Sequence, residues 1–126
     1  MKMLVCKKVS FDAAHFLPNY SGKCANMHGH RWIVELAIEG EVKATGMVVD
    51  FTLLKEFLEE VKEVFDHKVI NDVIENPTAE NICVWIRDRL TQWKLDGHID
   101  FLKLFRCELE FIRVWETPDS YAELRL

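Results

Sequence analysis

The sequence predicts an α+β fold, in which one antiparallel sheet of four strands carries two helices on one face. Alternating polar and apolar side chains near both ends of the chain indicate the strands, and apolar side chains at three- and four-residue steps in its middle indicate the helices. The order along the chain is strand, strand, helix, helix, strand, strand. A length of 126 residues is close to the common size of one domain, so we expect residues 1–126 to form a single domain.

Two strands are expected before the helices, over residues 4–16 and 28–39. The second is the clearest in the chain, because apolar residues from Trp32 to Ile38 alternate with charged residues such as Glu35. A loop that contains Pro, Asn, Ser and Gly separates the two strands. This arrangement is consistent with a hairpin.

The chain then turns and enters its first helix. Residues 40–46 indicate the turn, and residues 47–49 indicate a short strand or extension. An amphipathic helix is predicted over residues 52–65, since apolar side chains recur along one face while Glu and Lys fill the other. Asp50 or Thr52 is expected to cap its first turn.

A second helix is predicted from Thr78, its expected N-cap, to about Leu95. Residues 96–105 fit neither period, and two further strands are predicted over residues 106–116 and 120–126. Two hairpins leave the edges of the sheet open, and such edges must be covered or paired with another chain. Oligomerisation through the sheet edges is therefore expected.

Composition narrows the function classes. Apolar residues make up 49% of the chain, which is enough for a packed core, and a net charge of −5 disfavours broad binding to nucleic acid. No stretch approaches the roughly 20 apolar residues of a membrane span, and the first residues lack the apolar core of a signal peptide. We therefore expect a cytoplasmic protein whose four cysteines, none in a CxxC pair, stay reduced.

Three histidines and a cysteine within sixteen residues, His15, Cys24, His28 and His30, have the spacing of a metal site. Side chains at i and i+2 of a strand point the same way, so His28 and His30 share one strand face. His15 ends the preceding strand and is expected near them at the looped end of a hairpin. Imidazole donors favour zinc, although ligand type also admits iron or nickel. Spacing alone leaves two possible roles for Cys24, a fourth ligand of a closed structural site or a free thiolate beside the metal.

Four further residues are candidates for chemistry, and each also has an ordinary structural explanation. Asp66 and His67 form an adjacent acid and imidazole that suit proton transfer, or a solvated helix end. Glu116 ends a strand beside an aromatic residue and suits the guanidine-like ring edge of a pterin or guanine, although most such glutamates face solvent. Thr78 is a candidate substrate-binding residue, although helix capping also explains it.

Six motifs occur in order along nearly the whole chain, and together they are highly specific. They are Phe11-Asp12-Ala13-Ala14-His15, Cys24-Ala-Asn-Met-His28-Gly-His30, Gly46-Met-Val-Val-Asp50-Phe51, Phe65-Asp66-His67-Lys-Val-Ile-Asn71-Asp72, Glu75-Asn-Pro-Thr-Ala-Glu80 and Trp115-Glu116-Thr117. With these motifs the chain resembles the family of 6-pyruvoyltetrahydropterin synthase and 6-carboxytetrahydropterin synthase.

The resemblance implies the tunnelling fold (T-fold), in which monomers pair their sheets into a barrel and trimers stack into a homohexamer with active sites between subunits. It also implies that Cys24 is a catalytic base and that Asp66 and His67 assist proton transfer. Glu116 is implied to hold the guanidine-like edge of the pterin. The implied zinc ligands are His15, His28 and His30.

The substrate implied by the resemblance is 7,8-dihydroneopterin triphosphate. The pyruvoyl branch of the family eliminates triphosphate after internal redox transfer, whereas the carboxy branch also cleaves a carbon–carbon bond and releases acetaldehyde. Three residues separate Cys24 from His28, and this gap resembles the carboxy branch, a zinc-dependent lyase of the 7-deazaguanine (queuosine or archaeosine) pathway. The competing functions are those of the pyruvoyl synthase, a folate-pathway relative, and a non-catalytic zinc or pterin-binding module.

Overall fold

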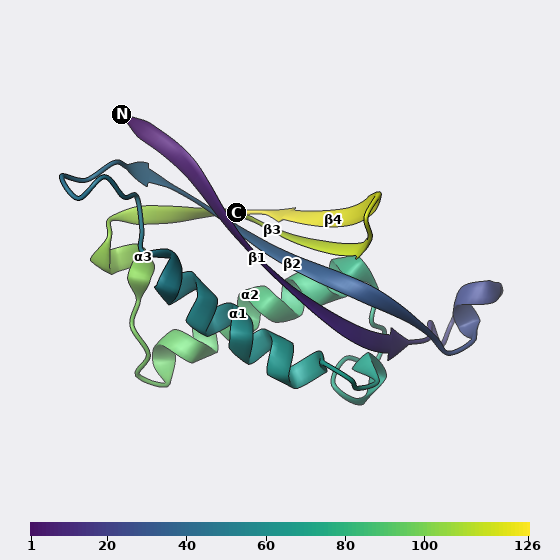
Figure 1. Ribbon diagram of the computed structural model, residues 1–126. Coiled ribbons are helices and arrows are strands. Elements are labelled where there is room, and N and C mark those ends of the chain that lie inside the picture. The colour runs from purple at the N-terminus through teal and green to yellow at the C-terminus, as the bar shows by residue number, and fades with distance from the viewer.

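The computed structural model describes residues 1–126 and has one sheet in which the strands follow chain order, β1-β2-β3-β4, each antiparallel to its neighbour. The helices all lie on one face of this sheet (Figure 1). The predicted α+β class with a four-stranded antiparallel sheet is therefore confirmed. The elements are β1 (Lys2–His15), β2 (His28–Glu41), α1 (Phe51–Phe65), α2 (Ala79–Leu95), α3 (Phe101–Leu104), β3 (Cys107–Thr117) and β4 (Ser120–Arg125).

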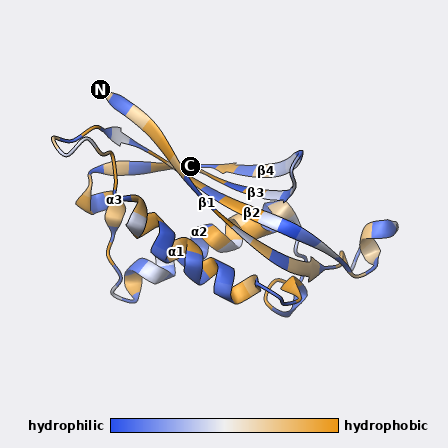
Figure 2. Cartoon of the chain, in the orientation of Figure 1, coloured by the Kyte–Doolittle hydropathy of each residue, from blue (hydrophilic) through white to orange (hydrophobic).

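The two long helices begin at side-chain caps. The cap of α2 is Thr78, as predicted, and of the two candidates for α1 the cap is Asp50. Asp50 Oδ1 accepts a hydrogen bond from Thr52 N (2.8 Å), and Thr78 Oγ1 accepts one from Asn81 N (3.1 Å). Both helices contain polar and apolar residues along their length (Figure 2). Their buried residues join those of the sheet in one core cluster. No helix combines the length and the apolar character needed to cross a bilayer. Fully buried side chains of the core include Trp32, Phe57, Phe65, Ile86 and Ile112.

Residues 47–49, for which a short strand or extension was expected, form no strand, so the strand alternative is wrong. Val48 and Val49 are each only 3% exposed, so their apolar character reflects packing into the core from a bend. The backbone N–H of Lys43 donates to the carbonyl of Met47 (2.9 Å), which closes this loop on itself. The loop therefore joins β2 to α1 without adding to the sheet.

The ambiguous residues 96–105 contain a third helix, α3, that the sequence did not predict. Its N-cap is Asp100, whose Oδ1 accepts a hydrogen bond from Lys103 N (3.2 Å). Phe101 is fully buried and fixes this helix against the core. A helix of only 4 residues is too short to display a helical period.

Replacing Phe57 by alanine is expected to lower the free energy of unfolding by about 3–5 kcal/mol. The Phe57 side chain on α1 is fully buried, and its ring centroid lies 5.6 Å from that of Trp93 on α2, so its loss leaves a cavity between the helices. Phe51 starts the same helix but is 48% exposed, so Phe51→Ala is the matched control and should cost much less. Urea unfolding measures both variants, and equal losses would contradict this account.

The face of the sheet opposite the helices carries a row of alternating charges. Glu35 lies within this row and is only 5% exposed. Its Oε2 accepts a hydrogen bond from Trp115 Nε1 (3.1 Å), which ties the end of β3 to β2 immediately before Glu116. Across the four strands, the paired residues of the row are Lys8, Glu35, Arg113 and Glu123.

Candidate active site

The hairpin of β1 and β2 brings the three histidines of the sequence motif together. His15 pairs with His28, and Ala13 pairs with His30, at the looped end of the hairpin. The ring centroids are 4.6 Å apart for His15 and His28, 5.4 Å for His15 and His30, and 4.9 Å for His28 and His30. The rings of His15 and His30 also lie edge-on to buried Trp32. The histidines are therefore grouped on the helix-covered face of the sheet, and the predicted shared face of His28 and His30 is confirmed.

Glu116 of β3 completes this group. Its Oε1 lies 3.0 Å from Nε2 of His30 and 3.3 Å from Nε2 of His15. The pairing of β3 with β4 shifts register between Trp115 and Thr117, so Glu116 lies at a β-bulge, a feature that redirects side chains beside active sites. One potential ligand atom from each member lies within 4.8 Å of the other three, and we call the four residues the histidine cluster: His15, His28, His30 and Glu116.

Backbone carbonyls determine which nitrogen of two histidines faces the cluster. Nδ1 of His15 lies 2.8 Å from the carbonyl oxygen of Pro77, and Nδ1 of His28 lies 2.7 Å from that of Asn26. A carbonyl can only accept, so each Nδ1 donates its hydrogen and leaves Nε2 of a neutral ring with a lone pair. The two Nε2 atoms are 3.1 Å apart. Two lone pairs repel at that distance, and a bound cation removes the repulsion.

Nε2 of His30 also lacks a bonding partner. This atom is buried and makes no well-formed hydrogen bond, although Oε1 of Glu116 is 3.0 Å away. Burial lowers the pKa of His30; the Glu116 carboxylate opposes this effect, and the other two histidines add to it. The lowered pKa favours the neutral ring, the form that can bind a metal ion. Three imidazoles and a carboxylate form a donor set that suits a divalent transition metal such as zinc.

Cys24 lies beside the histidine cluster and is not one of its members. It occupies a 3₁₀ turn, Lys23–Ala25, between β1 and β2, and it is half-buried. It lines a cavity of about 330 Å³ together with three of the cluster residues. The backbone N–H of Leu17 donates to the carbonyl of Cys24 (2.9 Å) and holds the turn against the end of β1. The potential metal ligands thus assemble without the thiol.

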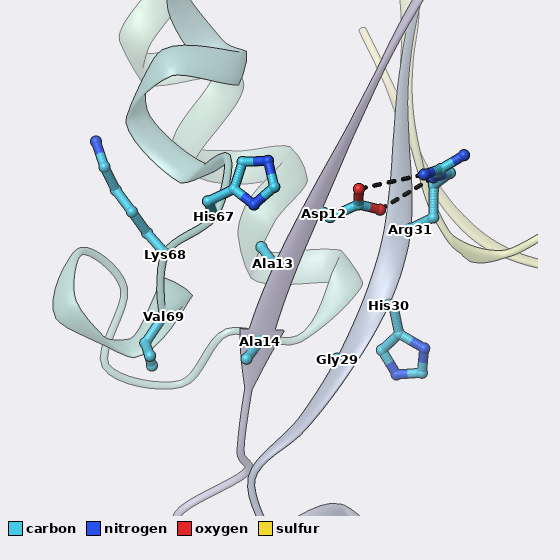
Figure 3. Close-up of a pocket in the computed structure, with 9 residues that line it drawn as sticks. All are labelled: Asp12, Ala13, Ala14, Gly29, His30, Arg31, His67, Lys68 and Val69. Carbon is cyan, nitrogen blue, oxygen red and sulfur yellow. Dashed lines mark hydrogen bonds and ion pairs between the residues drawn. The ribbon is translucent and has the colours of Figure 1, made fainter.

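Asp66 and His67 lie beside the outer edge of β1, next to Asp12. Asp66 ends α1, and its Oδ1 accepts a hydrogen bond from Asp12 N (3.1 Å). The His67 side chain is 80% exposed, and its Nε2 is 3.7 Å from Asp66 Oδ2, too far for a hydrogen bond. His67 lines a cavity of about 520 Å³ that extends to His30 but not to Cys24 (Figure 3). Within one chain, therefore, Cys24 and His67 face different cavities.

Besides Thr78, the start of α2 contributes Glu80, which the sequence pattern explains as ordinary helix capping. Thr78 accepts the capping hydrogen bond described above, whereas Glu80 lines a cavity of about 150 Å³ together with Glu116 and Tyr121. An acidic residue in the first turn of a helix is ordinarily explained by the helix dipole. Only the packing of α2 beside β3 and β4 reveals that two carboxylates share this cavity.

Comparison with known proteins gives this geometry a family. A family model described as 6-pyruvoyl tetrahydropterin synthase matches residues 4–126. The chain belongs to this family. The resemblance predicted from the motifs is therefore confirmed.

Relatives in this family match over almost the whole chain. The protein is 40% identical over 124 residues to a putative 6-carboxy-5,6,7,8-tetrahydropterin synthase of Archaeoglobus fulgidus. The matched region covers 98% of this chain and 96% of the relative. It is 34% identical to a dihydroneopterin monophosphate aldolase of Pyrococcus furiosus, over 98% of each chain. The structure of Caenorhabditis elegans 6-pyruvoyl tetrahydropterin synthase matches with a TM-score of 0.79 at 26% identity, covering 100% of this chain and 96% of that one.

Proposed function

We propose that this protein is a zinc-dependent lyase that converts 7,8-dihydroneopterin triphosphate and one water molecule to 6-carboxy-5,6,7,8-tetrahydropterin, acetaldehyde and triphosphate. The proposal depends on one observation above all: the histidine cluster adjoins a cavity that has Cys24 in its wall. A catalytic zinc site takes three protein ligands and keeps one position open. The three histidines can supply those ligands. The Archaeoglobus fulgidus relative, whose name is that of the carboxy enzyme, supports the choice of product.

In this proposal Glu116 holds the pterin instead of remaining with the histidines. Its side chain is 32% exposed and borders both the Cys24 cavity and the cavity at the start of α2. A carboxylate accepts two parallel hydrogen bonds from a guanidine-like edge, so rotation toward the substrate exchanges the imidazole contacts for pterin contacts. Thr78 directly precedes Ala79 in the wall of the second cavity, and it remains the proposed second contact to the substrate.

The remaining side chains handle protons in this proposal. When bound, zinc supplies a Lewis acid that polarises the hydroxyl groups of the substrate side chain. The three histidines are proposed to hold the zinc, and the cysteine thiolate of Cys24 to take a proton from that side chain. Asp66 and His67 are proposed to pass protons to and from the opposite side of the substrate.

We also propose that the active site forms between subunits of a cytoplasmic homohexamer. Because Cys24 and His67 face different cavities of one chain, a second copy is needed to bring the His67 of one subunit to the Cys24 of another. The outer edge of β4 and that of the first part of β1 have no neighbouring strand in the sheet, and open edges favour pairing between chains. The product is proposed to enter 7-deazaguanine synthesis, toward queuosine or archaeosine.

A second candidate function is aldol cleavage of a pterin side chain. The Pyrococcus furiosus relative, named a dihydroneopterin monophosphate aldolase, matches 98% of this chain at 34% identity. An aldolase would need the same metal and base but would act on a substrate with a single phosphate. Two further candidates are the pyruvoyl synthase and a non-catalytic zinc or pterin-binding module.

Product analysis separates these functions. We expect the zinc-loaded full chain to convert 7,8-dihydroneopterin triphosphate to 6-carboxytetrahydropterin with equal amounts of acetaldehyde and triphosphate, as measured by chromatography and mass spectrometry. A pyruvoyl pterin would assign the other branch, and cleavage of the monophosphate alone would assign the aldolase. Binding of zinc or pterin without any product would contradict all three enzyme functions.

A further inference from the structure

The segment after α1 pairs with the outer edge of β1 as a further strand would. The backbone N–H of His67 donates to the carbonyl of Asp12 (2.7 Å), and the N–H of Ala14 donates to the carbonyl of Lys68 (3.1 Å). Ala14 also forms an isolated parallel bridge with this segment. The supported edge leads directly to His15, so the segment stabilises the end of the strand that carries a member of the histidine cluster.

Asn71 continues this pairing with its side chain instead of its backbone. Its Oδ1 accepts a hydrogen bond from Phe16 N (3.0 Å), and its Nδ2 donates one to Phe16 O (2.9 Å). The carboxamide therefore offers one acceptor and one donor to the same residue, as a neighbouring strand does. Its Nδ2 also lies 3.5 Å from the carbonyl oxygen of Glu75, which links it weakly to the turn before α2.

Phe16 lies between two parts of the proposed active site. It directly follows His15, and the next residue, Leu17, donates its N–H to the carbonyl of Cys24 (2.9 Å). The two hydrogen bonds from Asn71 to Phe16 are partly buried, so their loss is costly, because water replaces a buried partner poorly. Any movement of the Phe16 backbone is transmitted in one direction to His15 and in the other to the Cys24 turn.

We propose that Asn71 is a positioning residue that holds His15 and the Cys24 turn in place for metal binding and proton transfer. This inference rests on the proposed function, since the site that Asn71 positions is the proposed zinc and thiol site. A carboxamide is required at this position. An aspartate of the same size lacks the donor for the Phe16 carbonyl and places a negative charge against it, and alanine leaves both backbone groups without a partner.

The test compares the wild-type full chain with Asn71→Asp. We expect the affinity for zinc, measured by competition with a chelator, to fall about 10-fold, in the range found when groups that orient metal ligands are removed. We expect kcat to fall at least as far while KM changes less than about 3-fold, because substrate contacts are intact. Alkylation of Cys24 by iodoacetamide, followed by peptide mass spectrometry, should become faster as its turn loosens.

Asp100→Ala is the matched control. It removes the capping hydrogen bond from Lys103 N (3.2 Å) in α3, which is also a bond between a side chain and the backbone, at the end of the molecule away from the Cys24 turn (Figure 1). It should leave zinc affinity and Cys24 alkylation unchanged. If Asn71→Asp lowers the thermal midpoint like this control and also leaves both readouts unchanged, Asn71 is only a structural residue and the proposal is overturned.

Two further measurements keep the outcome decisive. If Asn71→Asp does not fold, Asn71→Gln takes its place, since it keeps both polar groups but moves them outward; smaller losses of the same kind are expected, and wild-type values would overturn the proposal. If the wild type binds zinc but yields no pterin product, the proposed function fails while the zinc affinities still decide the role of Asn71. If the wild type binds no zinc, the alkylation rates of Cys24 decide it.

Discussion

His28→Ala is expected to remove both the metal and the enzymatic activity. The variant keeps two imidazoles and one carboxylate of the histidine cluster, but the nitrogen that faces Nε2 of His15 at 3.1 Å is lost. Removing a group that only orients a ligand costs about 10–100-fold in metal affinity, so the loss of a ligand itself should exceed about 100-fold. Elemental analysis after gel filtration, together with the product assay, measures both effects.

His28 is a better test position than His15. The His15 side chain is only 2% exposed, and its ring lies 4.8 Å from that of Trp32, so its removal would also disturb the packing of the core. His28 is less buried and lies at the very start of β2, where truncation leaves the sheet intact. The thermal midpoint of the metal-free variant should therefore stay close to that of the metal-free wild type.

His98→Ala is the control for a histidine outside the cluster. Its ring is stacked on that of Trp93, with centroids 4.5 Å apart, and neither residue belongs to the histidine cluster. We expect this variant to retain metal and activity. If His28→Ala retains a full equivalent of tightly bound metal, the histidine cluster is not the metal site and the proposed function loses its basis.

The part of the site that the sequence predicted is local in the chain. Strand parity places His28 and His30 on one face, and the hairpin register sets His15 opposite His28. Both facts depend only on a regular hairpin of neighbouring strands. The caps Asp50 and Thr78 were predictable for the same reason, because a capping side chain bonds to a backbone group two or three residues away.

The position of Glu116 depends on contacts that no local pattern contains. Its approach to His30 requires the register of β2 against β3, and Glu116 also lies at the bulge in the pairing of β3 with β4. From the sequence it was a candidate for binding a pterin edge, and its 3.0 Å contact with Nε2 of His30 is a finding of the structure. The Glu116 carboxylate therefore borders the histidine nitrogens, the Cys24 cavity and the cavity at the start of α2.

The pairing of residues 66–71 with β1 could not be predicted from the sequence, for a different reason. His67 has φ of 59°, in the left-handed region that few residues other than glycine adopt, and Asn71 pairs through its side chain. Neither device produces a hydrophobic period. The outer edge of β4 and the first part of β1 are accordingly open, while the part of β1 that leads to His15 is covered by its own chain.

Cys24→Ala is expected to keep zinc binding and to lose most of the enzymatic activity. Because the histidine cluster assembles without the thiol, the variant should bind one equivalent of zinc with wild-type affinity. If Cys24 is the base, turnover should fall by about 10²–10⁴-fold, the usual contribution of a positioned general base. Metal analysis and the product assay on one preparation give both quantities.

Cys6→Ala is the matched control for this last variant. Cys6 is an exposed thiol of β1, and desolvation followed by the nearby Glu35 charge raises its pKa, which favours the protonated thiol. Cys6 does not border the Cys24 cavity. It should keep both zinc and activity. Loss of zinc with Cys24→Ala would instead make the cysteine a ligand, and a closed site of three histidines and one cysteine has no open position for a substrate. The zinc content of this one variant therefore decides between a structural site and a catalytic one.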